Sequence, residues 1–207
     1  MLHKKIISTV AVVAIVASIL AIISNLKPPK ADIKPYEALG WGAAEETAKF
    51  LNNRGNVVVV YPNFGNYKVL NPRFESLLKS FKKALSKNKQ ITLVNIEQAP
   101  VEPPSMSKVG IYLPSEQFDL ISQKYAKASA IVSFVGIPTL SDKSIQAVKE
   151  NGARWVVVLE SGLRPDQQLK NHAIFMAIVP RAGESGKLST GRTLRERFDQ
   201  EYEVIQP

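Results

Sequence analysis

Polar and aromatic side chains follow three predicted strands where those strands end, and these residue types could contact a ligand. In open α/β sheets, ligands meet the carboxyl ends of the strands. Asn, Glu and Ser side chains at those ends would form a polar rim, with Tyr and Phe rings as apolar platforms. The candidate ligand-binding residues are Tyr61, Asn63, Phe64, Asn66, Glu97, Glu160 and Ser161. The alternative is that the Asn residues serve only as turn residues, as in any such fold.

No catalytic constellation accompanies this rim. The chain has no cysteine, which excludes disulfides, thiolate metal sites and cysteine nucleophiles. Its two histidines are His3 and His172, and His172 has no visible catalytic partner. The stretch 183–190 departs from the phosphate-loop pattern, because Arg181 stands where its first glycine belongs and Leu188 follows the lysine. The sequence therefore predicts no catalytic residue, no cofactor and no metal site, in a protein that is not an enzyme.

Helical and extended patterns alternate along the chain between residues 36 and 180. Strands are expected at Val57–Tyr61, Ile91–Ile96, Ala130–Val135, Arg154–Leu159 and Ala173–Val179, with helices near 36–53, 72–86, 114–127 and 141–151. Ser115 and Ser141 are predicted N-caps, and Gly152 is a predicted helix stop. This alternation is typical of βαβ units with helices on both faces of a parallel sheet. We therefore predict an α/β fold, a three-layer sandwich with a mostly parallel sheet of about five strands.

The longest apolar run lies at the N-terminus and predicts a single transmembrane helix. Ile6–Ile23 holds eighteen residues without a charge, Pro or Gly, and would form about 27 Å of helix, close to the ~30 Å core of a bilayer. Ile22 stands where a signal-peptide cleavage site needs a small residue. The alternatives are a cleaved signal peptide and a buried core helix. We divide the chain into a basic tail (1–5), an anchor (6–25), a Pro-rich linker (26–35), an α/β domain (36–180) and a C-terminal extension (181–207).

The anchor also predicts a location and a contact surface. A short basic N-terminus before a long domain favours a cytoplasmic N-terminus and a periplasmic or extracellular C-terminal domain, although lysines flank the anchor on both sides. Ala14 and Ser18, and likewise Ala17 and Ala21, are small residues four positions apart. Such pairs let another membrane helix approach closely. The alternative is that Ala is simply common in membrane helices.

The positive charge of the chain is unevenly distributed. The formal net charge is +9, and residues 1–30 hold four lysines and no acidic residue, which leaves +5 for the remainder. Five lysines cluster within 79–89, beside Phe74, Leu77, Phe81 and Leu85 at helical spacing. The lysines therefore form the solvent-exposed face of an amphipathic helix. No interleaving of aromatic and basic residues predicts nucleic-acid binding, whereas a weak preference for anionic headgroups or acidic partners is expected.

Two stretches of the domain follow a family pattern. Arg73 lies near the start of its helix and is followed by aromatic residues and by the pair Ala84-Leu85, and a later helix that ends in Gly152 leads into a hydrophobic strand. Over roughly residues 43–159 this pattern resembles one lobe of the type I periplasmic binding proteins and the related sugar-binding regulator domains. The resemblance implies an α/β lobe of the kind that closes with a second lobe over a ligand. It also implies Glu160 as the nearest equivalent of the family's strand-end Asp, which holds a sugar hydroxyl.

These observations lead to two functional expectations. The first is a membrane-anchored, non-catalytic accessory or structural subunit of a larger membrane-associated assembly, whose extracytoplasmic α/β domain makes protein contacts. Its partners would be the bilayer and other protein subunits, and not nucleic acid. The alternative is a single-lobe solute-binding or sensory module with a small-molecule ligand.

Overall fold

The computed structural model describes residues 32–63, 71–101, 110–152, 154–160, 164–182 and 191–207. Contacts divide the chain into two compact units, residues 1–32 and 33–207, and the second is the α/β domain. Within the described ranges, no helix is both long and apolar enough to cross a membrane. The predicted anchor Ile6–Ile23, with its small residues Ala14, Ala17, Ser18 and Ala21, lies outside the described residues.

Six strands form one sheet in the order β2-β1-β3-β4-β5-β6. They are β1 (Gly55–Asn63), β2 (Ile91–Pro100), β3 (Ala130–Ser133), β4 (Trp155–Val158), β5 (Met176–Pro180) and β6 (Tyr202–Ile205). The first five run parallel, and β6 pairs antiparallel with β5. Along β2 the register shifts between Leu93 and Asn95, so Val94 has no direct partner on β1. The four central strands, β1, β3, β4 and β5, are largely apolar and rich in β-branched residues, as expected of a sheet covered on both faces.

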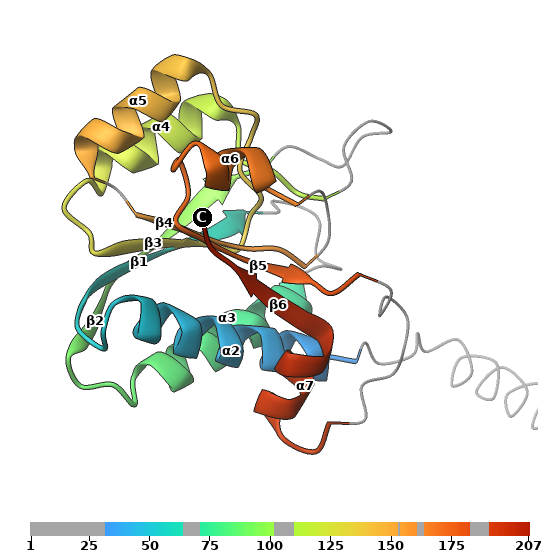
Figure 1. The fold of residues 1–207 in the computed structure, drawn as a ribbon. Coiled ribbons are helices and arrows are strands. Elements are labelled where there is room, and N and C mark those ends of the chain that lie inside the picture. Colours follow the sequence, from blue (N-terminus) through green and yellow to red (C-terminus); the bar gives the residue numbers. More distant parts are fainter. Residues whose placement is uncertain (1–31, 64–70, 102–109, 153, 161–163, 183–190) are drawn as a thin grey trace, which may run out of the picture. The chain divides into compact units, whose positions relative to one another are not determined.

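Helices cover both faces of the sheet (Figure 1). One layer holds α2 (Lys34–Phe50), α3 (Asn71–Leu85) and α7 (Leu194–Glu201). The other layer holds α4 (Ser115–Lys124), α5 (Asp142–Asn151) and α6 (Asp166–Lys170). The predicted three-layer α/β sandwich with a mostly parallel sheet is therefore confirmed for the described part of the chain.

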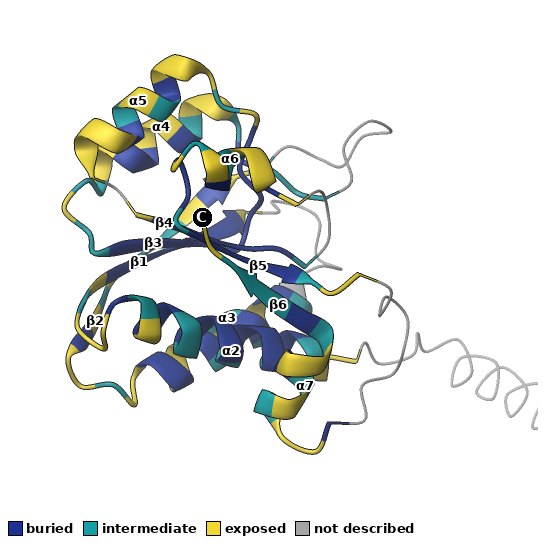
Figure 2. Cartoon of the chain, viewed as in Figure 1, coloured by how far each residue is buried: buried dark blue, intermediate teal, exposed yellow. Residues whose placement is uncertain are grey.

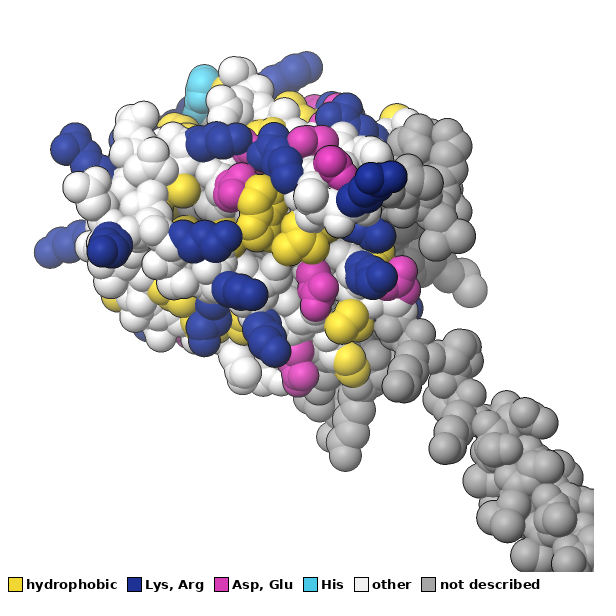
Figure 3. All heavy atoms as spheres, turned by 90° about the horizontal axis from the view of Figure 1, so that it is seen from below, with side chains coloured by type: hydrophobic (Ala, Val, Ile, Leu, Met, Phe, Trp, Pro, Cys, Tyr) yellow, Lys and Arg dark blue, Asp and Glu magenta, His cyan; other side chains and the backbone are white. Residues whose placement is uncertain are grey.

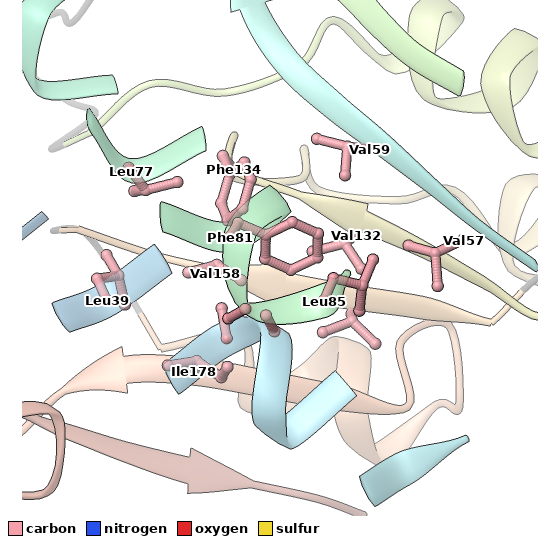
Figure 4. Packing of buried hydrophobic residues seen from close by; sticks show 14 of the residues in the cluster. Leu39, Val57, Val59, Leu77, Phe81, Leu85, Val132, Phe134, Val158 and Ile178 are labelled. Atoms are coloured by element: carbon pink, nitrogen blue, oxygen red, sulfur yellow. The ribbon is translucent and has the colours of Figure 1, made fainter. Parts of the chain in front are cut away.

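The larger core lies between the sheet and the layer of α2 and α3. Leu39 of α2, Phe81 of α3 and Val59 of β1 are all fully buried in it. Figure 4 shows their side chains pointing toward one another between helices and strands. The rings of Phe81 and Phe134 meet edge to face with centroids 5.3 Å apart, a geometry that adds to the hydrophobic stabilisation. Figure 2 shows the corresponding bands of buried residues on both helices and on the strands.

The second core lies between the sheet and the layer of α4, α5 and α6. The rings of Phe118 and Trp155 stack with centroids 4.6 Å apart. The indole nitrogen of Trp155 donates a hydrogen bond of 3.0 Å to the Ser122 hydroxyl, which donates in turn to the carbonyl of Phe118. Because every polar group in this chain of contacts has a partner, the buried indole and hydroxyl cost little on folding.

The sheet has one strand more than the about five that the sequence predicted. β6 consists of four residues that follow α7 directly, and three of them are only partly buried. So short a segment on a sheet edge shows no clear hydrophobic period, and for this reason the pattern did not reveal it. The five-residue helix α6 was not predicted either, because it is too short for a helical period.

The predicted helix caps have different outcomes. Ser141 is confirmed as the N-cap of α5, since its side chain accepts a hydrogen bond of 3.1 Å from the backbone nitrogen of Ser144. Gly152 ends α5 in the left-handed conformation with φ of 67°, also as predicted. The prediction for Ser115 is wrong. Pro114 takes the N-cap position of α4 and Ser115 lies inside the first turn, where its side chain caps nothing.

Segment 181–207 adds α7 and β6 to the domain. A capping box between Thr193 and Glu196 begins α7. Arg195 then pairs with Glu46 of α2 and with Asp199 of its own helix, each at 2.8 Å. The ring of Phe198 is buried against α2. Since the chain passes from β5 through this short helix into β6, the described segments after β5 complete the sheet of the same domain.

Gly40 of α2 makes possible the close approach of α2 and α3. A β-carbon at this position would overlap the backbone carbonyl of Leu77 on α3, which cannot rotate away. At Gly42 a β-carbon would overlap the ring of Phe198, which is fully buried and stacks on Tyr202. We expect Gly40→Ala to cost about 1–3 kcal/mol of unfolding free energy, as overpacking typically does. A thermal melt of this variant tests the expectation, and an unchanged melting temperature would contradict the packing described.

Candidate functional site

The carboxyl ends of the parallel strands meet at one edge of the sheet, which we call the carboxyl edge. β1 ends there at Asn63, and Glu160 lies two residues beyond the end of β4. The helices of α/β units run back against the strands, so the first turns of α2 and α3 lie at this same edge (Figure 1). The edge therefore combines strand-end residues with residues from the first turns of helices.

Tyr36, Arg73 and Glu160 form a cluster at the carboxyl edge. Tyr36, in the first turn of α2, donates a hydrogen bond from its hydroxyl to Oε1 of Glu160. The Arg73 guanidinium, in the first turn of α3, lies over the Tyr36 ring at 5.5 Å from its centroid. Burial, and then the nearby Glu160 carboxylate, raise the pKa of Tyr36 well above its ordinary value. The phenol therefore stays protonated at neutral pH and holds the carboxylate in one orientation.

Aromatic residues flank this cluster on the same face of the sheet. Tyr61 is buried, and its ring meets that of Phe74 edge to face with centroids 6.3 Å apart. Burial raises the pKa of Tyr61. Phe74, Phe134 and Glu160 together line a small hollow beside the end of β4. The predicted platform residue Tyr61 thus lies at the carboxyl edge, largely packed against its neighbour.

A larger cavity opens on the other side of the same strand ends. Its volume is about 190 Å³, and its walls come from the ends of β3 and β4, from α6 and from the segment before α4. Its lining is apolar at Ile137, Pro138, Val157 and Leu159 and polar at Tyr112, Thr139, Arg164 and Gln168. Gly136 and Leu159 line both this cavity and the small hollow, so the two lie on either side of the same strand ends.

Glu97 makes contacts apart from the Glu160 cluster. It points toward α4, where it accepts hydrogen bonds from the Tyr125 hydroxyl at 2.5 Å and from Lys124 at 2.9 Å. The Tyr125 hydrogen bond and then the Lys124 ammonium hold the pKa of Glu97 below its usual value. Glu97 therefore joins β2 to the end of α4, and the structure does not bring it together with Glu160.

The other predicted rim residues have simpler positions. Asn63 is exposed at the end of β1. Phe64, Asn66 and Ser161 lie outside the described residues, as do the full stretches 64–70 and 161–163 that follow β1 and β4. No group of His, Asp and Glu side chains within the described ranges is arranged to hold a metal ion.

Several polar residues at the carboxyl edge were missed by sequence reasoning, among them Tyr36, Arg73, Arg164 and Gln168. The signal that could have found two of them is their position in the first turn of a helix. Helices of a parallel α/β sheet start at the carboxyl edge, so residues in their first turns lie next to the strand ends. Tyr36 and Arg73 occupy such turns in helices that were predicted, whereas Arg164 and Gln168 belong to the unpredicted region of α6.

Comparison with known proteins bears on the fold. No protein-family model matches the sequence, and no curated protein matches it. An ABC transporter periplasmic solute-binding protein from Actinobacillus succinogenes with bound D-allose matches 76% of this chain at a TM-score of 0.51 and 15% identity. The domain has the fold of periplasmic sugar-binding proteins. The predicted resemblance to one lobe of this fold is thereby confirmed.

Two further structures with this fold give the same result. A solute-binding protein from Burkholderia graminis in complex with D-arabinose matches 82% of this chain with 17% identity and a TM-score of 0.51. The XylFII–LytSN complex matches 83% with 16% identity and the same TM-score. The matched regions cover 51% to 59% of those three chains. This chain therefore spans little more than half the length of these three proteins.

Proposed function

We propose that the domain binds a small neutral polyhydroxy solute, of the size and class of a sugar, at the carboxyl edge. The observation that carries this proposal is the oriented cluster of Tyr36, Arg73 and Glu160 at the ligand-binding edge of this fold. Two proteins of the same fold have D-allose and D-arabinose bound. We therefore favour solute binding over a purely structural role.

The chemistry of the cluster suits a neutral solute. Tyr36 engages one oxygen of the Glu160 carboxylate, and a carboxylate has several further lone pairs that accept from hydroxyl groups. The Arg73 guanidinium supplies donors for hydroxyl oxygens, and its charge offsets that of Glu160. The Phe74 and Phe134 rings border the hollow beside Glu160, but they are only 3% and 4% exposed and therefore leave little apolar surface for the C–H groups of a sugar ring.

The dimensions of the edge favour contact with one side of the solute. The hollow beside Glu160 holds about 30 Å³ and the cavity on the other side of the strand ends about 190 Å³, and both are smaller than the ~300–1,000 Å³ of typical ligand pockets. A solute bound to this edge would therefore keep one side exposed unless a further element covered it. We accordingly expect affinity in the micromolar to millimolar range.

We propose further that Ile6–Ile23 is retained as a membrane anchor and that the domain lies outside the cytoplasm. The eighteen-residue apolar run and its flanking lysines support this. An accessory subunit of a larger assembly, without an enzymatic activity, remains the second candidate function, supported by the unpaired lysines on α3 described below. The anchor would be contradicted if N-terminal sequencing showed that the mature protein begins after residue 24. A domain that resisted protease in spheroplasts would contradict its location outside the cytoplasm.

Thermal unfolding of the full chain in a neutral detergent tests sugar binding. Ligand at a hundred times its dissociation constant stabilises the folded state by about 2.7 kcal/mol, which corresponds to roughly 5–10 °C for a domain of this size. We expect such a rise with D-allose or D-arabinose. L-Arabinose at equal concentration is the matched control, because general osmolyte effects do not depend on handedness. Equal shifts with D- and L-arabinose, or no shift across a panel of monosaccharides, would contradict the proposal.

A further inference from the structure

A second concave surface lies at the opposite end of the domain, between the C-terminal halves of α2 and α3. It encloses about 370 Å³, and we call it the basic groove. Three small buried residues line it, and its remaining lining is almost entirely basic or amide. The small residues are Ala44, Ala48 and Ala84, and the polar ones are Glu45, Lys49, Asn53, Lys87, Asn88 and Lys89. The groove lies beside the amino ends of β1 and β2, far along the strands from the carboxyl edge.

The charge around the groove is largely uncompensated. Five lysines lie on α3 or just after it and are exposed, namely Lys79, Lys82, Lys83, Lys87 and Lys89. Among the described residues none of the five forms an ion pair. Figure 3 views the domain from this side and shows Lys and Arg side chains scattered over the face, with Asp and Glu side chains and apolar patches among them. The charge of these lysines equals the +5 excess of residues 31–207.

The polar groups that line the groove are mainly hydrogen-bond donors. Asn88 is engaged, since its amide nitrogen donates to Oδ1 of Asn53 at 2.8 Å and its oxygen accepts from the backbone of Gln90. Lys49 is engaged as well, since its ammonium group donates to Oε1 of Glu46 at 2.7 Å. The donors left toward a ligand are the amide nitrogen of Asn53 and the ammonium groups of Lys87 and Lys89. Glu45 is the one acid in the lining, and burial raises its pKa while Arg195 counteracts the shift. An occupant of this surface must therefore supply acceptors and negative charge.

We propose that the basic groove binds an acidic segment of another protein. The concave surface, which is lined in part by Ala44, Ala48 and Ala84, admits a chain segment, whereas a flat bilayer surface would reach only the outer lysines. The stretches of this chain outside the described residues do not fit. Residues 1–31 carry lysines and no acid, and 64–70, 102–109 and 183–190 are neutral or basic. A second copy is also a poor match, because each domain carries the same positive excess.

Fluorescence anisotropy on the full chain in a neutral detergent tests this inference. The probe is a labelled ten-residue peptide of alternating Glu and Ala, and the same peptide with Gln for Glu is the reference. Lys87→Gln combined with Lys89→Gln is expected to weaken binding of the acidic peptide about tenfold, through loss of two ion pairs. The matched control, Lys143→Gln with Lys149→Gln on α5 in the opposite layer, is expected to leave affinity within about twofold of wild type.

Variants that fill the basic groove show whether its space, and not only its charge, is needed for peptide binding. Ala48→Leu and Ala84→Leu keep every lysine, and we expect either one to weaken the peptide about tenfold by occupying its space. A photoreactive peptide on the unmodified chain gives a test without substitution, with labelling expected within 84–89 and absent from 142–151. Unchanged binding to folded groove-filled variants, or labelling elsewhere, would overturn the inference. Stronger binding to mixed micelles of phosphatidylglycerol, or equal competition by inorganic phosphate, would also overturn it and assign the surface to lipid or free anion.

Discussion

Val157→Asp is expected to unfold the domain. Val157 lies in β4, between β3 and β5, and its side chain is fully buried in the core beneath α4 and α6. An uncompensated charge there costs several kcal/mol, against a typical total stability of about 5–15 kcal/mol. Circular dichroism during heating should therefore show no cooperative transition, or one lowered by more than about 10 °C.

Val94→Asp is the matched control for this substitution. Val94 lies on the edge strand β2, where the register shift leaves it without a partner on β1, and it is 55% exposed. Its replacement by Asp should change the unfolding free energy by no more than about 0.5 kcal/mol. A cooperative melt near the wild-type temperature for Val157→Asp would show that β4 is not a central strand.

Glu160→Gln is expected to weaken sugar binding about ten- to a hundredfold, because hydrogen bonds to a charged group contribute about 1.5–3 kcal/mol. The substitution keeps the size of the side chain and an oxygen that can accept from Tyr36. Isothermal titration with the sugar that gives the largest thermal shift measures the change. Glu97→Gln is the matched control, since Glu97 is also near the end of a strand but contacts Lys124 and Tyr125. We expect it to leave the affinity within about twofold of wild type. Equal losses for both variants would mean that Glu160 does not contact the solute.

The architecture could be predicted where hydrophobic residues form long runs or recur at helical spacing. The β-branched run Val57–Tyr61 predicted a strand buried on both faces, and all of its residues lie inside β1. The lysines of 79–89 were predicted to face solvent, and α3 places them there with Phe81 and Leu85 buried beneath. By contrast, β6 was missed because a four-residue edge strand leaves no periodic signal. The N-cap of α4 was predicted at Ser115, but Pro114 takes this position and Ser115 is the first residue of the helix.

The candidate site was less accessible to prediction because it depends on the packing of helices against the sheet. Glu160 could be selected from the sequence, since it directly follows a predicted strand. Its partner Tyr36 is separated from it by 124 residues, and their contact arises only when α2 packs across the sheet. Glu97 was selected by the same strand-end argument, because the second strand was predicted to end at Ile96. In the structure β2 continues to Pro100, so Glu97 lies inside the strand, and its side chain points toward α4 on the other face of the sheet.

Amide hydrogen exchange of the full chain, measured with and without saturating sugar, tests whether a sugar binds at the carboxyl edge. The probe is whichever of D-allose and D-arabinose gives the larger thermal shift. We predict slower exchange in two segments far apart in sequence, the first turn of α2 around Tyr36 and the end of β4 before Glu160. The basic groove at 84–89 serves as the internal reference and should not change. Unaltered exchange at both carboxyl-edge segments under saturating sugar, or protection confined to 84–89, would contradict the account.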